Sequence, residues 1–271
     1  MQNIDPILFV QPILSIATAV VALAYWRRRR GYRWALLLLS LVAYAGAIMA
    51  KVAIQAVSYS AVSDYFGQVS VGLGLYFGVQ TVLLEVGLAY VLARYAARRT
   101  GLSPSDGVAY GISLGFWENA VLIGALPLVN LTVDYYVIAS GSSLGQQVYN
   151  TLMNADPAYF LPSSALAGLV VLGSVERVSS LFVHVAFGTL VVLAVITGRK
   201  RYLLYALPMG MVDALVPFAN LNLDLFEGGL LLLSIGFLAV TWLAMRSVGS
   251  ATPSTPQPPP ESVANTPLQL P

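Results

Sequence analysis

Seven apolar runs constrain the fold of this chain more than any other feature of its sequence. Each is close to the roughly 20 residues that a helix needs to cross the hydrocarbon core of a bilayer. The runs predict membrane spans at 7–26, 34–57, 68–93, 107–128, 176–197, 202–221 and 228–245. The composition agrees, because 58% of the residues are hydrophobic and only 10% are charged, against about 25% charged in a soluble domain. We therefore predict an all-α fold, a polytopic membrane bundle of about seven transmembrane helices.

Basic residues gather in every second gap between these runs, which sets an orientation. The clusters contain Arg27 to Arg30 with Arg33, then Arg94, Arg98 and Arg99, then Arg199, Lys200 and Arg201, and finally Arg246. The alternate gaps, 58–67, 129–162 and 222–227, contain no Lys or Arg. Because cytoplasmic loops carry the excess of basic residues, we expect the N-terminus outside and the C-terminus in the cytoplasm. The expected location is the cell membrane, with the first span uncleaved.

The chain divides into a multi-pass transmembrane domain, residues 1–246, and a Pro-rich, polar tail, residues 247–271. The tail cannot build a core, so we expect it to be disordered and cytoplasmic. Residues 129–162 are expected to be an outside loop that carries a short surface helix. The apolar segment 163–175 is too short to cross, and joined to 176–197 it would form a helix about 52 Å long. We favour a break near Gly173, with 163–175 re-entrant or interfacial, over one long projecting helix.

Composition also excludes several classes of function. The chain has no cysteine, which rules out disulfides, thiolate metal sites and cysteine nucleophiles. Fourteen Lys and Arg against twelve Asp and Glu give a net charge of only +2, too small for a nucleic-acid-binding field. The partners that we expect are the lipid bilayer and a membrane-protein or peptide substrate.

Ionisable residues at membrane depth are the candidates for function, because each costs at least ~2.5–3.5 kcal/mol to insert and so usually faces a polar interior. At about 1.5 Å per helical residue, Glu118 and Asp213 both lie about 16 Å above the inner boundary, and His184 lies about 18 Å above it. Three polar groups from three spans are thus predicted at one height. This coincidence predicts a shared polar site.

The remaining charged residues are expected elsewhere. Glu176 and Arg177 are predicted near the outer boundary, while Lys51 and Glu85 are predicted near opposite faces of the membrane, as interfacial anchors or a structural ion pair. In the site itself, Glu118 could act as a general base with His184 or a second carboxyl as the acid. A metal held by His184, Glu118 and Asp213 would have a carboxylate-heavy ligand set, since the chain has one histidine. A structural hydrogen-bond cluster is the alternative.

Three segments resemble the YhfC-type intramembrane peptidases. They are GISLGFWENAVLIG at 111–124, SVERVSSLFVHVAFGTLVV at 174–192 and YLLYALPMGMVDALVPF at 202–218. The shared pattern is a Gly-rich segment ending in Glu118, then Glu176 and Arg177 followed by His184, then a later helix with Asp213. The resemblance covers roughly residues 100–220. The family lies in a broader group with CAAX prenyl endopeptidases, PrsW-type proteases and the APH subunits of γ-secretase.

The resemblance implies a helical bundle that hydrolyses a peptide bond in or near the bilayer, with Glu118 activating water, His184 polarising or protonating, and Glu176, Arg177 and Asp213 completing the site. It also implies zinc, but this chain has Leu114 and Met209 where histidines are expected. Because the group includes the non-catalytic APH subunits, a scaffold or chaperone of the same fold is the second hypothesis. A small proton-coupled transporter ranks third, because the sequence shows no repeated half.

Overall fold

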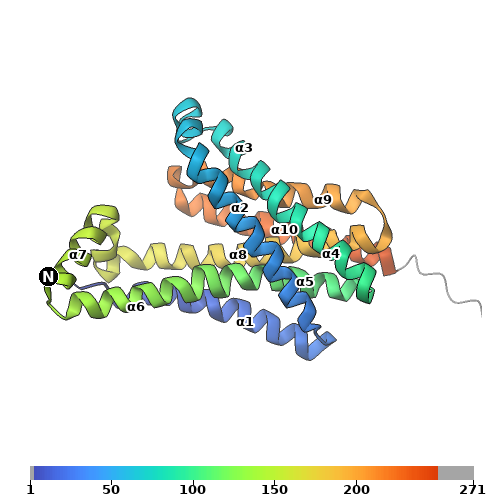
Figure 1. The fold of residues 1–271 in the computed structure, drawn as a ribbon, viewed down its shortest axis with the longest axis horizontal. Coiled ribbons are helices and arrows are strands. Elements are labelled where there is room, and N and C mark those ends of the chain that lie inside the picture. Colours follow the sequence, from blue (N-terminus) through green and yellow to red (C-terminus); the bar gives the residue numbers. More distant parts are fainter. Residues whose placement is uncertain (1–2, 250–271) are drawn as a thin grey trace, which may run out of the picture.

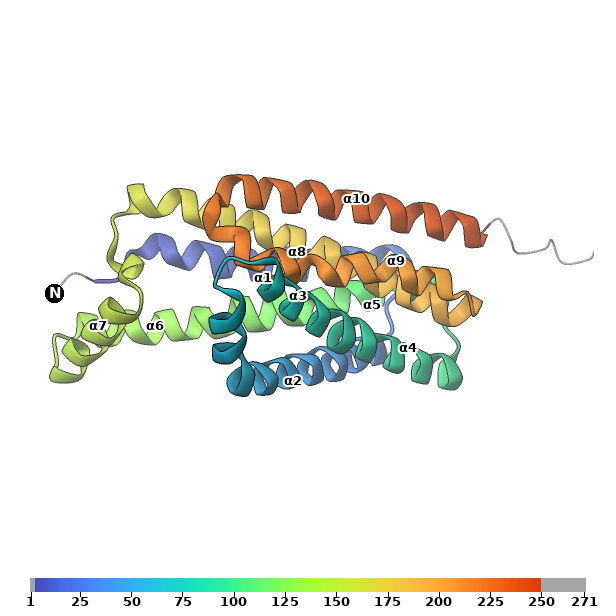
Figure 2. The same cartoon turned by 90° about the horizontal axis from the view of Figure 1, so that it is seen from above.

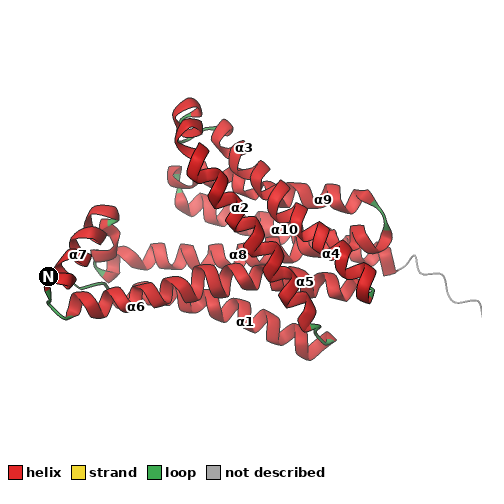
Figure 3. Cartoon of the chain, viewed as in Figure 1, coloured by secondary structure: helices red, strands yellow, loops and turns green. Residues whose placement is uncertain are grey.

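A computed structural model of the chain describes residues 3–249. Figure 3 shows helices joined by short loops, and no strand occurs in this part of the chain. Seven helical segments of the described residues are long and apolar enough to cross a membrane. They are Pro6–Arg30, Trp34–Phe66, Val71–Thr100, Pro104–Ala139, Ser163–Thr197, Lys200–Ala219 and Leu223–Val248. The predicted all-α bundle with seven spans is confirmed. Most of the predicted tail, residues 250–271, lies outside the described residues.

The elements are numbered in chain order, and four of the spans change their helical type along their length. The first spans are η1 (Pro6–Phe9) with α1 (Val10–Arg30), α2 (Trp34–Phe66), and α3 (Val71–Gln80), η2 (Thr81–Val86) and α4 (Gly87–Thr100). The next are α5 (Pro104–Phe116), η3 (Trp117–Ala125) and α6 (Leu126–Ala139), then α7 (Ser143–Ala155) and η4 (Pro157–Phe160). The last are α8 (Ser163–Thr197), α9 (Lys200–Gly210) with η5 (Met211–Leu221), and α10 (Leu223–Gly249).

Helix α8 is the centre of the bundle. Of its most apolar stretch 67% is buried by other helices, against 33% or less in the other six spans. In Figure 1 it runs along the length of the molecule beside α5, and Figure 2 shows α10 and α2 on opposite sides of it. A helix covered on most of its surface cannot turn polar groups toward lipid, so those of α8 must be satisfied by neighbouring helices.

Glycines allow α5 to approach α8 closely. A Cβ atom on Gly188 would lie 2.5 Å from the Cα atom of Gly111, and one on Gly111 would lie 2.6 Å from the Cα atom of Val185. Small residues at helix contacts let backbones pack tightly in lipid, where no hydrophobic force draws helices together. This contact fixes α5 against the turn of α8 that contains His184.

The predicted break in α8 is wrong, because the helix is continuous from Ser163 to Thr197. The N-terminal half of α8 has a partner that no local pattern reveals. Leu166 and Val170 are buried, and Gly173 leaves room for the side chain of Gln11 from α1. A hydrogen bond from Ser163 to Asp5 ties the start of α8 to the N-terminal segment and lowers the pKa of that carboxyl.

The predicted outside loop 129–162 is mostly helical, which is a second correction. The fourth span continues through α6 to Ala139, past the predicted end at 128. The expected short helix is α7, capped by the Ser142 hydroxyl on the amide of Gly145. Packing explains the extra helix, since Ile4, Leu131, Ile138 and Phe160 form a small second core. At the far left of Figure 1, α7 lies against the end of α6.

The basic clusters meet at one end of the bundle. Arg33, after α1, donates to the backbone oxygen of Gly101, after α4. Tyr202, near the start of α9, shares a hydrogen bond with Ser247 near the end of α10. In Figure 1 these four helix ends lie on the side away from α7. The alternation of basic and non-basic gaps therefore corresponds to the two ends of the bundle.

Replacing Gly188 by Ala should lower the free energy of unfolding by about 1–3 kcal/mol, because the new methyl overpacks a backbone contact with α5. Gly168→Ala on the same helix is the control, since nothing lies within 4 Å of the added Cβ. There the substitution should stabilise by about 0.8–1 kcal/mol through helix propensity. Thermal unfolding in detergent measures both. Equal shifts for the two variants would contradict the close packing of α5 on α8.

Candidate functional site

Two glutamates of the site lie in π-helical segments. Glu85 belongs to η2 and Glu118 to η3, each a wide turn inserted into a membrane-spanning α-helix. Such segments are rare and occur frequently at functional sites, because they rotate side chains out of the regular helical register. In η3 the fully buried Asn119 also donates to the backbone oxygen of Arg177. This bond joins the π-helical turn to α8.

A cavity of about 390 Å³ lies between these turns, α8, η5 and the start of α10. Its volume is within the range of ligand pockets. Its charged or titratable lining residues are Lys51, Glu85, Glu118, Glu176, Arg177, His184, Asp213 and Glu227, together with Tyr44. The rest of the wall is mostly apolar. Polar side chains from six of the seven spans therefore face one space inside the bundle.

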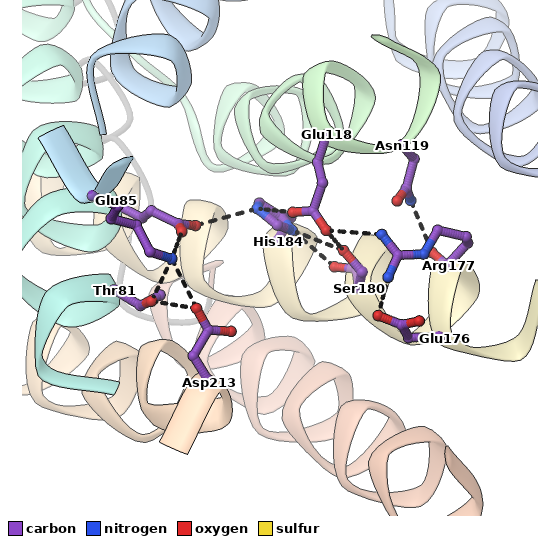
Figure 4. Close-up of polar contacts among 10 residues, drawn as sticks. Thr81, Glu85, Glu118, Asn119, Glu176, Arg177, Ser180, His184 and Asp213 are labelled. Atoms are coloured by element: carbon purple, nitrogen blue, oxygen red, sulfur yellow. Dashed lines mark hydrogen bonds and ion pairs between the residues drawn. The ribbon is translucent and has the colours of Figure 1, made fainter. Parts of the chain in front are cut away.

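His184 and Glu118 face each other across the first half of this site, as Figure 4 shows. The Nε2 atom of His184 lies 3.3 Å from Oε2 of Glu118. The other oxygen of Glu118 accepts hydrogen bonds from Arg177 at 3.2 Å and from the Ser180 hydroxyl at 2.8 Å. Arg177 also pairs with Glu176. One carboxylate oxygen is thus fixed by α8, and the other is directed at the imidazole.

The orientation of the His184 ring is set by its own helix. Its Nδ1 atom lies 2.9 Å from the backbone oxygen of Ser180, and because a carbonyl can only accept, Nδ1 carries a proton. The Nε2 atom is buried and has no hydrogen-bond partner among the described residues. Aromatic rings of Tyr44 and Phe187 lie beside the imidazole. Nε2 is therefore the atom of this histidine that is left for chemistry.

Lys51 organises the second half of the site. Its ammonium donates to Glu85 at 2.7 Å, to Asp213 at 2.8 Å and to Thr81 at 2.8 Å, and Thr81 also donates to Asp213. The two halves approach each other where Oε2 of Glu85 lies 3.7 Å from Nε2 of His184. Figure 4 shows this chain of contacts from Asp213 to Glu176.

The structure brings four of the predicted site residues into one group, namely Glu118, Glu176, Arg177 and His184. Asp213 lines the same cavity but contacts Lys51 and Thr81 rather than His184. The expectation that Lys51 and Glu85 lie near opposite faces is wrong, since they form a buried ion pair. The third span ends at Thr100 instead of 93, which puts Glu85 near its middle. Of the two roles considered for this pair, the ion pair is the observed one.

Two residues of the site were not predicted. Ser180 lies one helical turn from both Glu176 and His184, so helical spacing alone could have identified it as part of the same face of α8. Glu227 lies in the first two turns of α10 and is buried, with only 3% of its surface exposed. It was overlooked because the sequence places it in a gap between two apolar runs.

The donor set does not fit a metal centre. Among residues 3–249 no group of three or more His, Asp or Glu side chains is arranged to hold a metal ion. Asp213, one of the three predicted ligands, is held by Lys51. Arg177 and Lys51 hold the Oε1 atoms of Glu118 and Glu85, which leaves one oxygen of each carboxylate to face His184. Met209 lines the cavity where a histidine was expected, and Leu114 is buried in the core. Catalytic zinc usually has three protein ligands.

Comparison with known proteins identifies one family. Residues 14–229 match the YhfC intramembrane metalloprotease family, which covers most of the chain and all residues of the site. No curated protein and no solved structure matches the chain. The family name implies a metal that the arrangement of donors in this chain does not fit.

Replacing Lys51 by Met should lower the free energy of unfolding by about 3–5 kcal/mol, because Glu85 and Asp213 would be left buried without their cation. The control is Arg33→Met, since half of the Arg33 side chain is exposed in its ion pair with Asp106 and exposed pairs contribute about 0–1 kcal/mol. Chemical denaturation in mixed micelles measures both. A Lys51 variant no less stable than the Arg33 variant would show that the buried pairs are not structural.

The metal content of the purified protein tests whether the side chains of the cavity bind zinc. Elemental mass spectrometry of the detergent-purified protein, grown with zinc in the medium, should find far less than one zinc per chain, in the wild type and in His184→Ala alike. Stoichiometric zinc in the wild type that disappears in His184→Ala would contradict this interpretation. It would mean that the Oε2 atoms of Glu85 and Glu118, which face His184, ligate a metal together with the histidine.

Proposed function

The chain belongs to the YhfC intramembrane metalloprotease family, and from that membership we propose that it hydrolyses a peptide bond within or at the edge of the bilayer. One observation carries the proposal. A carboxylate and an imidazole, Glu118 and His184, face each other 3.3 Å apart at the wall of a polar cavity inside a membrane bundle. This is the pairing of a general base with a general acid that amide hydrolysis requires.

Glu118 is the base in this proposal. Arg177 and Ser180 hold its Oε1 atom, so only Oε2 is free to accept a proton from a water molecule in the cavity. The water oxygen then attacks the carbonyl carbon of the peptide bond and forms a tetrahedral intermediate. Fixing the carboxylate from α8 limits the reorganisation that this step needs.

His184 is the acid. Its Nδ1 proton is committed to the Ser180 carbonyl, so the protonated ring donates from Nε2 to the nitrogen of the leaving amine as the carbon–nitrogen bond breaks. Glu118 then passes the proton that it took from water to Nε2 of His184, 3.3 Å away. The products are a new carboxyl and a new amine, and both side chains regain their starting states. Glu176, Arg177, Asp213 and Lys51 position this pair and contact no reacting atom.

We also propose that the protein lies in the cell membrane with its N-terminus outside, because the basic clusters meet at one end of the bundle. The chain has no cysteine, so single introduced cysteines report position cleanly. A cysteine at Gln147 in α7 should react with a membrane-impermeant maleimide on intact cells. One at Ser105, at the basic end, should react only after the cells are opened. The opposite labelling pattern would reverse the orientation.

Replacing Glu118 by Gln should reduce peptide cleavage by about 10²–10⁴-fold, the usual contribution of a general base. The assay reconstitutes the purified protein in liposomes with a mixture of single-span peptides and reads new termini by mass spectrometry. Asp134→Asn, in α6 and outside the cavity, is the control and should cleave like the wild type. Cleavage by the Glu118 variant at the wild-type rate would refute the assignment of the base.

A scaffold is the second candidate, favoured by Met209 in the cavity wall in place of an expected histidine. A scaffold would use the cavity to hold a partner helix without cutting it. The Glu118→Ala variant separates the two functions. If the protein is a scaffold, the wild type cleaves no peptide and the variant still retains its partner in a pull-down. If it is a peptidase, the wild type cleaves the peptide and the variant does not.

A further inference from the structure

The cavity has more carboxylates than cations to neutralise them. Five acidic side chains line it, against Lys51 and Arg177 as permanent cations. Lys51 bridges Glu85 and Asp213, and Arg177 bridges Glu118 and Glu176. With all five carboxylates ionised and His184 protonated, five negative and three positive charges would leave a net charge of −2. Four of the carboxylates have a cation, and the fifth, Glu227, has none among the described residues.

Glu227 is the residue that lacks a partner. Its side chain comes from the start of α10, only 3% of its surface is exposed, and it lines the cavity. Its Oε2 atom is buried and has no hydrogen-bond partner in the described part of the chain. Burying a carboxylate without a partner costs several kcal/mol. A group that enters the cavity is the partner that the fold itself does not supply.

We propose that Glu227 binds the ammonium or guanidinium group of a Lys or Arg side chain on the peptide that occupies the cavity. The proposal rests on the proposed function for its substrate, and it defines the class of that substrate as a membrane peptide with a basic residue near the cleaved bond. Glu227 is then a specificity-determining residue rather than a catalytic one.

The surroundings of Glu227 suit such a side chain. Phe226 and Leu230, its neighbours on α10, line the cavity with Val216 of η5 and can pack against the methylene stem of Lys or Arg. Glu227 lines the same cavity as Glu176 and Arg177, and Arg177 contacts Glu118. A cation bound at Glu227 would therefore share the cavity with the base.

A metal ion fits this place less well than a side-chain cation. A divalent ion needs several ligands, and the other carboxylates of the cavity already have Lys51 or Arg177 as partners. A single carboxylate is sufficient for one ammonium or guanidinium group, which forms a charge-assisted hydrogen bond with it. The proposal accordingly predicts competition by basic peptides and none by zinc.

The test measures binding and cleavage separately. Full-length protein in lipid nanodiscs is titrated with two fluorescent single-span peptides, identical except for Lys or norleucine at the middle of the span. Fluorescence anisotropy should give a dissociation constant about tenfold lower for the Lys peptide, in the range expected for a hydrogen bond to a charged group. Glu227→Gln should remove this preference, and Asp134→Asn should retain it.

Three results would overturn the proposal. The first is equal binding of both peptides by the wild type, and the second is a preference for Lys that persists in Glu227→Gln. The third is loss of the preference when zinc is added, because zinc then occupies the site. Peptides with Arg and with Glu at the same position test the wild type alone, so the outcome does not depend on folding of the variant. If the wild type cleaves no peptide but prefers the Lys peptide, the peptidase function is refuted and the binding site at Glu227 is retained. If the wild type cleaves peptides without preferring the Lys peptide, the binding site at Glu227 is refuted and the peptidase function is retained.

Discussion

Pairing of buried charge is the constraint on which the rest of this structure depends. In a bilayer an unpaired charge cannot be left to solvent, so each cation of the cavity holds two carboxylates. Lys51 of α2 joins Glu85 of η2 to Asp213 of η5, and Arg177 of α8 joins Glu118 of η3 to its own neighbour Glu176. These pairs link helices that have little hydrophobic reason to associate in lipid. They also leave His184 between two carboxylates, where an acid and a base can act together.

Local properties of the sequence were sufficient to predict the membrane spans, but not to predict which residues of different spans contact one another. Apolar run length is local, so seven helices were predicted, and the shared height of Glu118 and His184 correctly indicated a common site. Asp213 has the right height but faces Lys51, because depth does not determine the direction in which a side chain points. The unbroken α8 could not be predicted either, since its N-terminal half is stabilised by Gln11 and other residues far away in the sequence. Ser180 could have been found from its helical spacing to Glu176 and His184, whereas Glu227 was missed because it lies in a gap between two apolar runs.

The difference between the family's name and this chain's donors has a physical origin. Lys51 and Arg177 neutralise the carboxylates that a metal would need and hold one oxygen of each, and Met209 supplies no imidazole. The same arrangement leaves one oxygen of Glu118 and one nitrogen of His184 facing each other, and these are the base and the acid of the proposed function. The cations Lys51 and Arg177, which neutralise buried carboxylates, therefore share one cavity with the proposed acid and base.

The measurement that tests this account most directly is a double-mutant cycle on the cleavage of one reconstituted peptide, with Glu118→Gln, His184→Ala and the two combined. Groups that act as a unit are strongly non-additive in kcat/KM. The account predicts that the double variant is no slower than the slower single variant. Losses that multiply would mean that Glu118 and His184 act independently, and the paired acid and base at the centre of this interpretation would be wrong.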